Sequence, residues 1–305
     1  MENRNLLAYI FILLKGMAMG AADVVPGVSG GTIAFISGIY EELITSINNV
    51  NVSLLNTLRK EGIKAFWTKL NGNFLLALLL GIGISVLSLA KLISWLMENE
   101  PIPLWSFFFG LVVASIILVG KEIKKWNLAA IIILILGAAI AFYVTKLPPS
   151  ENSASLPYLF FSGALAICAM ILPGISGAFI LVLLGSYKTV LDAVHERDLK
   201  IVFTVGLGAI FGLLSFAKLL KWMFVHYKNL TLALLTGFIL GSLNKIWPWK
   251  EVLETKMFGE KIITIKDQNI SPFSFDGDPQ LISAIILAIL GFSLIFILEK
   301  LAAKK

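Results

Sequence analysis

A Pro-Gly-x-Ser-Gly motif occurs twice in the chain, first as Pro26-Gly27-Val28-Ser29-Gly30 and again as Pro173-Gly174-Ile175-Ser176-Gly177. The copies stand 147 residues apart (173 − 26), and each interrupts a long apolar segment. Further residues that return at this spacing are Gly16 as Gly163, Gly38 as Gly185 and Tyr40 as Tyr187. Paired apolar segments that are broken by Gly and Pro at corresponding positions are typical of transporters whose site lies at a repeat interface.

A second set of matches occurs at a spacing of 127 residues (218 − 91). Gly81, Ser88, Ala90, Lys91, Leu92, Trp95, Gly110 and Ser115 correspond to Gly208, Ser215, Ala217, Lys218, Leu219, Trp222, Gly237 and Ser242. The two sets together predict two repeats, residues 1–147 and 148–305, that build a single membrane domain.

The composition places this domain in a membrane. Of the 305 residues, 58% are hydrophobic and 14% are charged, whereas soluble domains carry roughly 25% charged residues. A helix needs about 20 apolar residues to cross a bilayer. Six segments meet this requirement and are predicted to span as helices: 74–97, 103–120, 127–145, 200–225, 229–247 and 280–299.

Two further apolar segments, 6–45 and 157–195, carry the motifs near their middle. Each break divides its segment into two short half-helices, which predicts a re-entrant hairpin. Broken backbone is tolerated at membrane depth only where protein or a wet cavity surrounds it. The alternative that the first hairpin spans fully stays open.

The basic residues predict the topology, because cytoplasmic loops are enriched in Lys and Arg. With Lys304 and Lys305 inside, the order of spans places Arg4 and Lys121 inside and the acidic loop 248–278 outside. Both termini are thus predicted to be cytoplasmic. Three spans and one hairpin per half also require the second half to be inverted.

The net charge of +6 lies mostly in short loops, so a nucleic-acid partner is not expected.

The breaks are predicted to bind an anion. Pro ends the first half-helix, Gly permits a tight turn, and Ser can cap the half-helix that follows. Free N–H groups at helix N-termini suit a phosphate or carboxylate. The expected phosphate-binding residues are Ser29, Gly30, Gly31, Thr32, Ser176 and Gly177, with Pro26, Gly27, Pro173 and Gly174 forming the turns. The alternative is that the motifs are turns whose glycines serve only helix packing.

Four charged residues within apolar segments are further candidates. Asp23 could carry a coupling proton or bind a cation, or it could orient the hairpin through backbone N–H groups or Lys15, since a carboxylate in a membrane is costly. Lys91 and Lys218 are equivalent in the repeats and could offer cations to an anionic headgroup, with Lys15 as a weaker candidate. The alternative is that these lysines reach toward the membrane surface.

The sequence carries no signature of an enzyme. His195 and His226 are its two histidines and form no His-x-x-x-His pair. Neither a nucleophile elbow nor a phosphate-binding loop with its Lys occurs. No cofactor or metal is expected, while coupling to a proton or sodium gradient stays open.

The run from Ala22 to Thr32, with the later Leu172-Pro173-Gly174-Ile175-Ser176-Gly177, resembles the bacterial polyprenyl-phosphate (undecaprenyl-phosphate) transporters. The resemblance implies a protein of the bacterial cytoplasmic membrane that returns undecaprenyl phosphate to the inner leaflet for reuse in envelope synthesis. The second copy continues with Ala178-Phe179 where the first has Gly31-Thr32, so an asymmetric site is expected, with more polar contacts at the first hairpin. The oligomeric state is not predicted.

Three alternatives remain at this stage. The first is a small-anion channel or exchanger, because broken helices also serve such ions. The second is an intramembrane enzyme that processes lipids. The third is a non-transporting partner of envelope machinery.

Overall fold

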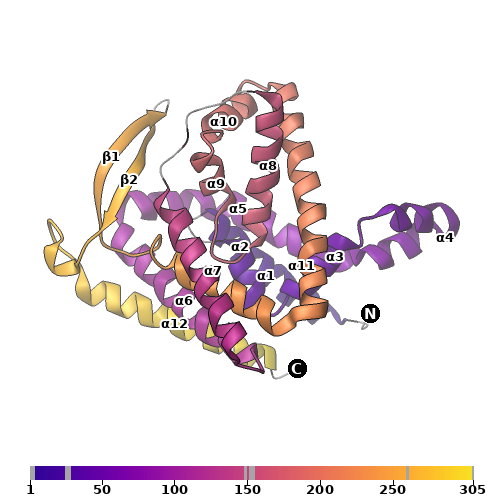
Figure 1. Cartoon of the computed structure of the whole chain (residues 1–305), viewed down its shortest axis with the longest axis horizontal. Coiled ribbons are helices and arrows are strands. Elements are labelled where there is room, and N and C mark those ends of the chain that lie inside the picture. Colours follow the sequence, from indigo (N-terminus) through magenta and orange to yellow (C-terminus); the bar gives the residue numbers. More distant parts are fainter. Residues whose placement is uncertain (1–3, 25–28, 148–149, 151–154, 259–260, 304–305) are drawn as a thin grey trace.

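The computed structural model describes residues 4–24, 29–147, 150, 155–258 and 261–303, and it is mostly helical (Figure 1). Five of the described helices are long and apolar enough to cross a membrane, or six if one bent helix pair counts as a span. At this level the prediction of a helical membrane protein is confirmed.

The first half of the chain contains α1 (Leu6–Val24), α2 (Gly30–Ile36), α3 (Tyr40–Asn48), α4 (Val52–Leu70), α5 (Gly72–Asn99), α6 (Pro101–Glu122) and α7 (Leu128–Lys146). The second half contains α8 (Leu156–Ile171), α9 (Gly177–Leu183), α10 (Tyr187–His195), α11 (Leu199–Ser242), the strands β1 (Lys250–Phe258) and β2 (Lys261–Asn269), the short helix η1 (Pro272–Ser274) and α12 (Leu281–Ala303).

Most predicted spans coincide with helices. α5, α6 and α7 begin and end within about two residues of the predicted bounds. The predicted spans 200–225 and 229–247 are joined in α11, which bends at Tyr227, where φ and ψ are −137° and 45°. α11 ends at Ser242, earlier than predicted, and the Asn244 carbonyl oxygen beyond it accepts from Asn269 Nδ2. α12 corresponds to the predicted span 280–299.

Both predicted hairpins contain a long helix, a break and two short helices. After each break the short helix packs back on the long one, α2 on α1 and α9 on α8. The prediction of a short first half-helix is wrong for α1, whose 19 residues make it a candidate span, whereas α8 has 16. The difference arises because Pro26 stands about one turn further from the start of its apolar run than Pro173 does. α9 and α10 meet at an angle of 113°.

Glycines bring the backbones of paired helices into contact. In the α1–α5 pair, a β-carbon on Gly16 would clash with the Leu78 carbonyl, and one on Gly81 would clash with the Leu13 carbonyl. The equivalent residues Gly163 and Gly208 make the same kind of approach between α8 and α11, to the carbonyl groups of Val205 and Phe160. Small residues allow two helix backbones to approach this closely. Close packing stabilises helix pairs in a membrane, because the hydrophobic effect does not drive helices together in lipid.

A second pair of helix contacts repeats in the same way. Gly110 of α6 and Gly291 of α12 each face the backbone of the other helix. Gly237 of α11 and Gly137 of α7 do the same, and Gly237 follows Gly110 at the spacing of 127 residues. Helix pairs from the two halves therefore pack through residues at matching positions.

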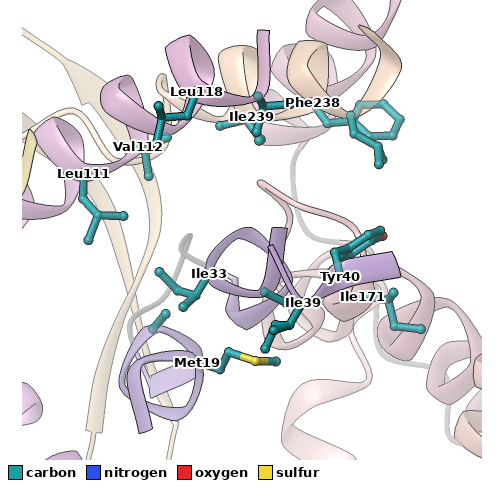
Figure 2. Close-up of a cluster of buried hydrophobic side chains, with 14 of the residues drawn as sticks. Met19, Ile33, Ile39, Tyr40, Leu111, Val112, Leu118, Ile171, Phe238 and Ile239 are labelled. Carbon is teal, nitrogen blue, oxygen red and sulfur yellow. The ribbon is translucent and has the colours of Figure 1, made fainter. Parts of the chain in front are cut away.

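A buried apolar cluster joins the two halves (Figure 2). In Figure 2, residues of α6 and of the second part of α11 line one side of this cluster, and residues of the first hairpin and of α8 line the other. The residues labelled in Figure 2 are Met19, Ile33, Ile39, Tyr40, Leu111, Val112, Leu118, Ile171, Phe238 and Ile239. The breaks thus lie within a core to which both halves contribute.

Two connections extend from the helical body in Figure 1. Loop 248–278 contains the antiparallel β1–β2 hairpin. α4 projects from the body, and within it Gly62 has a φ of 84°, which divides the helix.

Candidate functional site

The two breaks meet inside the molecule. The Ser29 hydroxyl donates to the carbonyl oxygen of Met170 at 3.0 Å and lies 3.2 Å from that of Leu172. In return, the Gly174 N–H donates to Thr32 Oγ1 at 2.9 Å. Ser29 is fully buried and Thr32 is 1% exposed. Residues more than 140 positions apart in the sequence are therefore joined by hydrogen bonds in the core.

Two side chains satisfy the N-terminus of α2. Ser29 Oγ accepts from the Gly31 N–H at 3.1 Å, which is the predicted N-cap. Asp23 Oδ1 accepts from the Gly30 N–H at 2.7 Å. A carboxylate at this end also interacts favourably with the helix dipole. One interpretation of Asp23 was that it orients the hairpin through backbone N–H groups, and its bond to the Gly30 N–H is a contact of this kind.

Glycine is required at two positions of the first break. A β-carbon on Gly30 would come 2.5 Å from an Asp23 carboxylate oxygen. A β-carbon on Gly31 would clash with the Ile171 carbonyl, which belongs to the last turn of α8. Both contacts are so close because α2 is pressed between the end of α1 and the end of α8.

The second break is built differently. Ser176 occupies the N-cap position of α9 and is 7% exposed, but its side chain makes no capping hydrogen bond in the described residues, so the prediction that it caps is wrong here. Its backbone is extended, with φ −89° and ψ 132°, as is the backbone of Ser29 at the N-cap of α2. Gly174 has a φ of 89°, a region that L side chains rarely adopt. The first break contributes side chains and the second contributes backbone, in line with the expected asymmetry.

The remaining candidates lie in different places. Pro173 and Gly177 are buried at the second break, whereas Pro26 and Gly27 lie outside the described residues. Lys15 Nζ donates to the Ser37 carbonyl oxygen at 2.6 Å, at the C-terminal end of α2. Lys218 is exposed on α11, and the side chain of Lys91 lies outside the described residues. The phosphate-binding roles of all these residues stay predictions.

Sequence reasoning missed the carbonyl groups of Met170 and Leu172. Backbone acceptors carry no residue-type signal, so only the location of the repeat could have pointed to them. It also missed Glu42, which binds Arg4 Nη1 and Nη2 at 2.7 and 2.8 Å and accepts from Asn71 Nδ2. Burial raises the pKa of Glu42, but the hydrogen bonds from Arg4 and Asn71 and the charge of Arg4 outweigh it, and the pKa is lowered.

Comparisons with known proteins show the family to which the chain belongs. Over residues 19–262 the sequence matches the family described as undecaprenyl phosphate translocase-like. The chain belongs to this family. It is 46% identical to a polyprenyl-phosphate transporter of Vibrio cholerae over 302 residues, which cover 97% of this chain and 98% of that protein. It is 32% identical to a polyprenyl-phosphate transporter of Staphylococcus aureus over 77% of this chain and 85% of that protein. No solved structure matches the chain.

Among the described residues of this family member, no group of three or more His, Cys, Asp or Glu side chains is arranged to hold a metal ion. Polar groups near the breaks are instead hydroxyl, amide, carbonyl and carboxylate groups. The hydroxyl and amide N–H groups can donate hydrogen bonds to a phosphate, whereas the carbonyl and carboxylate groups only accept them. The donors can exchange one acceptor for another without breaking a covalent or metal–ligand bond.

Proposed function

We propose that the chain transports a polyprenyl phosphate, undecaprenyl phosphate above all, from the outer to the inner leaflet of the bacterial cytoplasmic membrane. The observation that carries this proposal is the hydrogen-bonded junction of the two breaks among candidate membrane spans. The relative from Vibrio cholerae, which matches nearly the whole chain and is named a polyprenyl-phosphate transporter, supports the substrate class.

The chemical problem is the headgroup. An ionised phosphate enters hydrocarbon only at a large cost in free energy, whereas the apolar isoprenoid tail is soluble in it. A transporter therefore has to supply polar contacts to the headgroup at membrane depth and can leave the tail in lipid. The N–H and hydroxyl groups around the breaks offer such contacts.

In this structure these groups bind one another. Ser29, Thr32 and Gly174 are paired across the junction, and Asp23 occupies the N-terminus of α2. We therefore assign the structure to a closed state in which the protein's own groups stand where the phosphate would bind. When the breaks separate, a phosphate takes their place on the same donors.

Asp23 links this exchange to charge. A carboxylate and a phosphate repel each other and compete for the Gly30 N–H, so phosphate binding requires Asp23 to move away or to take up a proton. A proton or cation bound at Asp23 would thus travel with the headgroup. This supports coupling of transport to an ion gradient.

We further propose an inverted repeat with both termini in the cytoplasm. The matching glycine contacts of α1–α5 with α8–α11 and of α6–α12 with α11–α7 support two related halves. The basic loops support the orientation. Such pseudo-symmetry would let the breaks open alternately to either leaflet.

The proposal is tested in proteoliposomes that hold the purified chain and a short-chain polyprenyl phosphate in one leaflet. We expect the protein to make the lipid accessible in the other leaflet, and Ser29→Ala with Ser176→Ala to abolish this acceleration while insertion is retained. Lys228→Gln, at an exposed surface ion pair with Glu41, is the matched control. Lipid exchange that is equal with and without protein would overturn the proposal, and a flux of small anions alone would move the function to an anion channel.

A further inference from the structure

Two lysines and one aspartate form a cluster that the transport proposal does not use. Lys245 Nζ lies 3.2 Å and Lys250 Nζ lies 3.3 Å from the same oxygen, Oδ2 of Asp267. Lys250 also donates to the carbonyl oxygen of Lys245 at 2.6 Å. Their side chains are partly buried, 25% exposed for Lys245, 15% for Lys250 and 23% for Asp267.

The cluster carries more positive than negative charge. Two ammonium groups share one carboxylate, and Lys146 at the end of α7 adds a further positive charge nearby. Burial and then the charge of Lys245 lower the pKa of Lys250 to about 8, against the opposing effect of Asp267. Partly buried charges of one sign are costly until a counter-charge joins them. The cluster is therefore short of one anion.

The cluster lies beside the second break. Lys245 Nζ stands 5.5 Å from the ring centre of Phe179, which is two residues into α9 after Gly177. Lys250 Nζ stands 5.5 Å from the ring centre of Trp105, at the start of α6. Lys245 therefore lies next to the first turn of α9, and Lys250 lies next to the start of α6.

The surroundings hold the cluster in place. Asn269 Nδ2 donates to the carbonyl oxygen and to Oδ1 of Asn244, and Asn244 Nδ2 donates to Thr145 at the end of α7. Trp247 and Trp249 donate their indole N–H groups to the carbonyl groups of Ile270 and Pro279. The β1–β2 hairpin, which extends from the helical body in Figure 1, is thereby fastened to α7 and α11. A preorganised site binds more tightly because less freedom is lost on binding.

We propose that Lys245 and Lys250, whose two positive charges share the single carboxylate of Asp267, form a phosphate-monoester site at which the substrate headgroup binds beside the second break. This rests on the proposed transport function. A phosphate monoester carries about −1.5 to −2 charges near neutral pH, and lysine binds phosphate as a point charge. A lipid headgroup and inorganic phosphate share this chemistry, and the experiment separates them.

Binding is measured on the purified full-length protein by calorimetric titration with a short-chain polyprenyl phosphate, with inorganic phosphate and with the uncharged polyprenol. We expect the double variant Lys245→Gln with Lys250→Gln to bind the lipid phosphate at least tenfold more weakly than the wild type. Lys228→Gln, on an exposed pair elsewhere, should bind as the wild type does. Asp267→Asn, which removes the competing carboxylate, should bind at least as tightly, and it tests the site even where the double variant fails to fold.

The outcomes separate the two proposals. Wild-type affinity in the double variant, or weaker binding in Asp267→Asn, would overturn the lysine site. Inorganic phosphate that binds the lysines as tightly as the lipid does, with lipid exchange unchanged in the double variant, would assign the site to free phosphate and overturn its role for the headgroup. Absence of lipid exchange by the wild-type protein in liposomes would overturn the transport function itself, whatever the titration shows.

Discussion

The two breaks share a motif but differ in what they contribute to their junction. Around the first, Asp23, Ser29 and Thr32 provide carboxylate and hydroxyl groups. Around the second, the backbone supplies the partners. The carbonyl oxygens of Met170 and Leu172 accept from Ser29, and the Gly174 N–H donates to Thr32. A repeated motif can therefore place complementary partners, rather than two copies of one site, on the two sides of one junction.

The difference can be traced to single positions. Gly31 is matched at the spacing of 147 residues by Ala178, and Thr32 by Phe179. Gly31 is buried against the end of α8, whereas Ala178 is exposed. Asp23 is matched by Met170, whose carbonyl group rather than its side chain enters the junction. Substitutions at matched positions should therefore have unequal effects.

The largest difference in stability between matched substitutions is expected when a methyl group is added at Gly31 in the first break. Gly31→Ala places a β-carbon against the Ile171 carbonyl, and overpacking of this kind costs about 1–3 kcal/mol. We expect a lower midpoint of thermal unfolding and loss of lipid exchange. The matched change Ala178→Gly should cost about 1 kcal/mol or less, the difference in helix propensity. Equal unfolding midpoints for the two variants would contradict the unequal packing of the breaks.

The next effect concerns the bond that crosses the junction. Thr32→Val keeps the shape of the side chain but leaves the buried N–H of Gly174 without its acceptor, at a cost of about 1–3 kcal/mol. We expect faster hydrogen exchange in peptides that contain Gly174. Thr32→Ser keeps the hydroxyl and should retain most of the protection. Unchanged exchange in Thr32→Val would show that the two breaks are held together by other contacts.

Two substitutions at Asp23 distinguish its role as a hydrogen-bond acceptor for α2 from the role of its negative charge. Asp23→Ala removes the acceptor for the Gly30 N–H and should lower the free energy of unfolding by about 0.5–2 kcal/mol. Asp23→Asn keeps an acceptor and should cost less, about 0.3–1 kcal/mol from the lost interaction with the helix dipole. Lipid exchange driven by a proton or sodium gradient should nevertheless be lost in Asp23→Asn. Undiminished coupling in that variant would leave Asp23 a structural role only.

Much of this arrangement could be predicted from the sequence because it depends on residue types that the chain repeats. The three spans of the first half, the bend near Tyr227 and the Ser29 cap follow from apolar length and from the Pro, Gly and Ser signals. The partners across the junction could not be predicted, since carbonyl groups are present at every residue. The cluster of Lys245, Lys250 and Asp267 was missed because the β1–β2 hairpin separates Asp267 from the two lysines in the sequence.

The smallest effect on stability is expected at Ser176, and it is the most informative about function. Because its side chain makes no capping bond in the described residues, Ser176→Ala should lower the free energy of unfolding by less than Ser29→Ala does. Ser29→Ala loses a cap and a buried bond and should cost about 1 kcal/mol. If Ser176 is held ready for the phosphate, its alanine variant should still bind the short-chain polyprenyl phosphate several-fold more weakly in titrations. Wild-type affinity would restrict phosphate binding to the first break, because the second would then supply backbone alone.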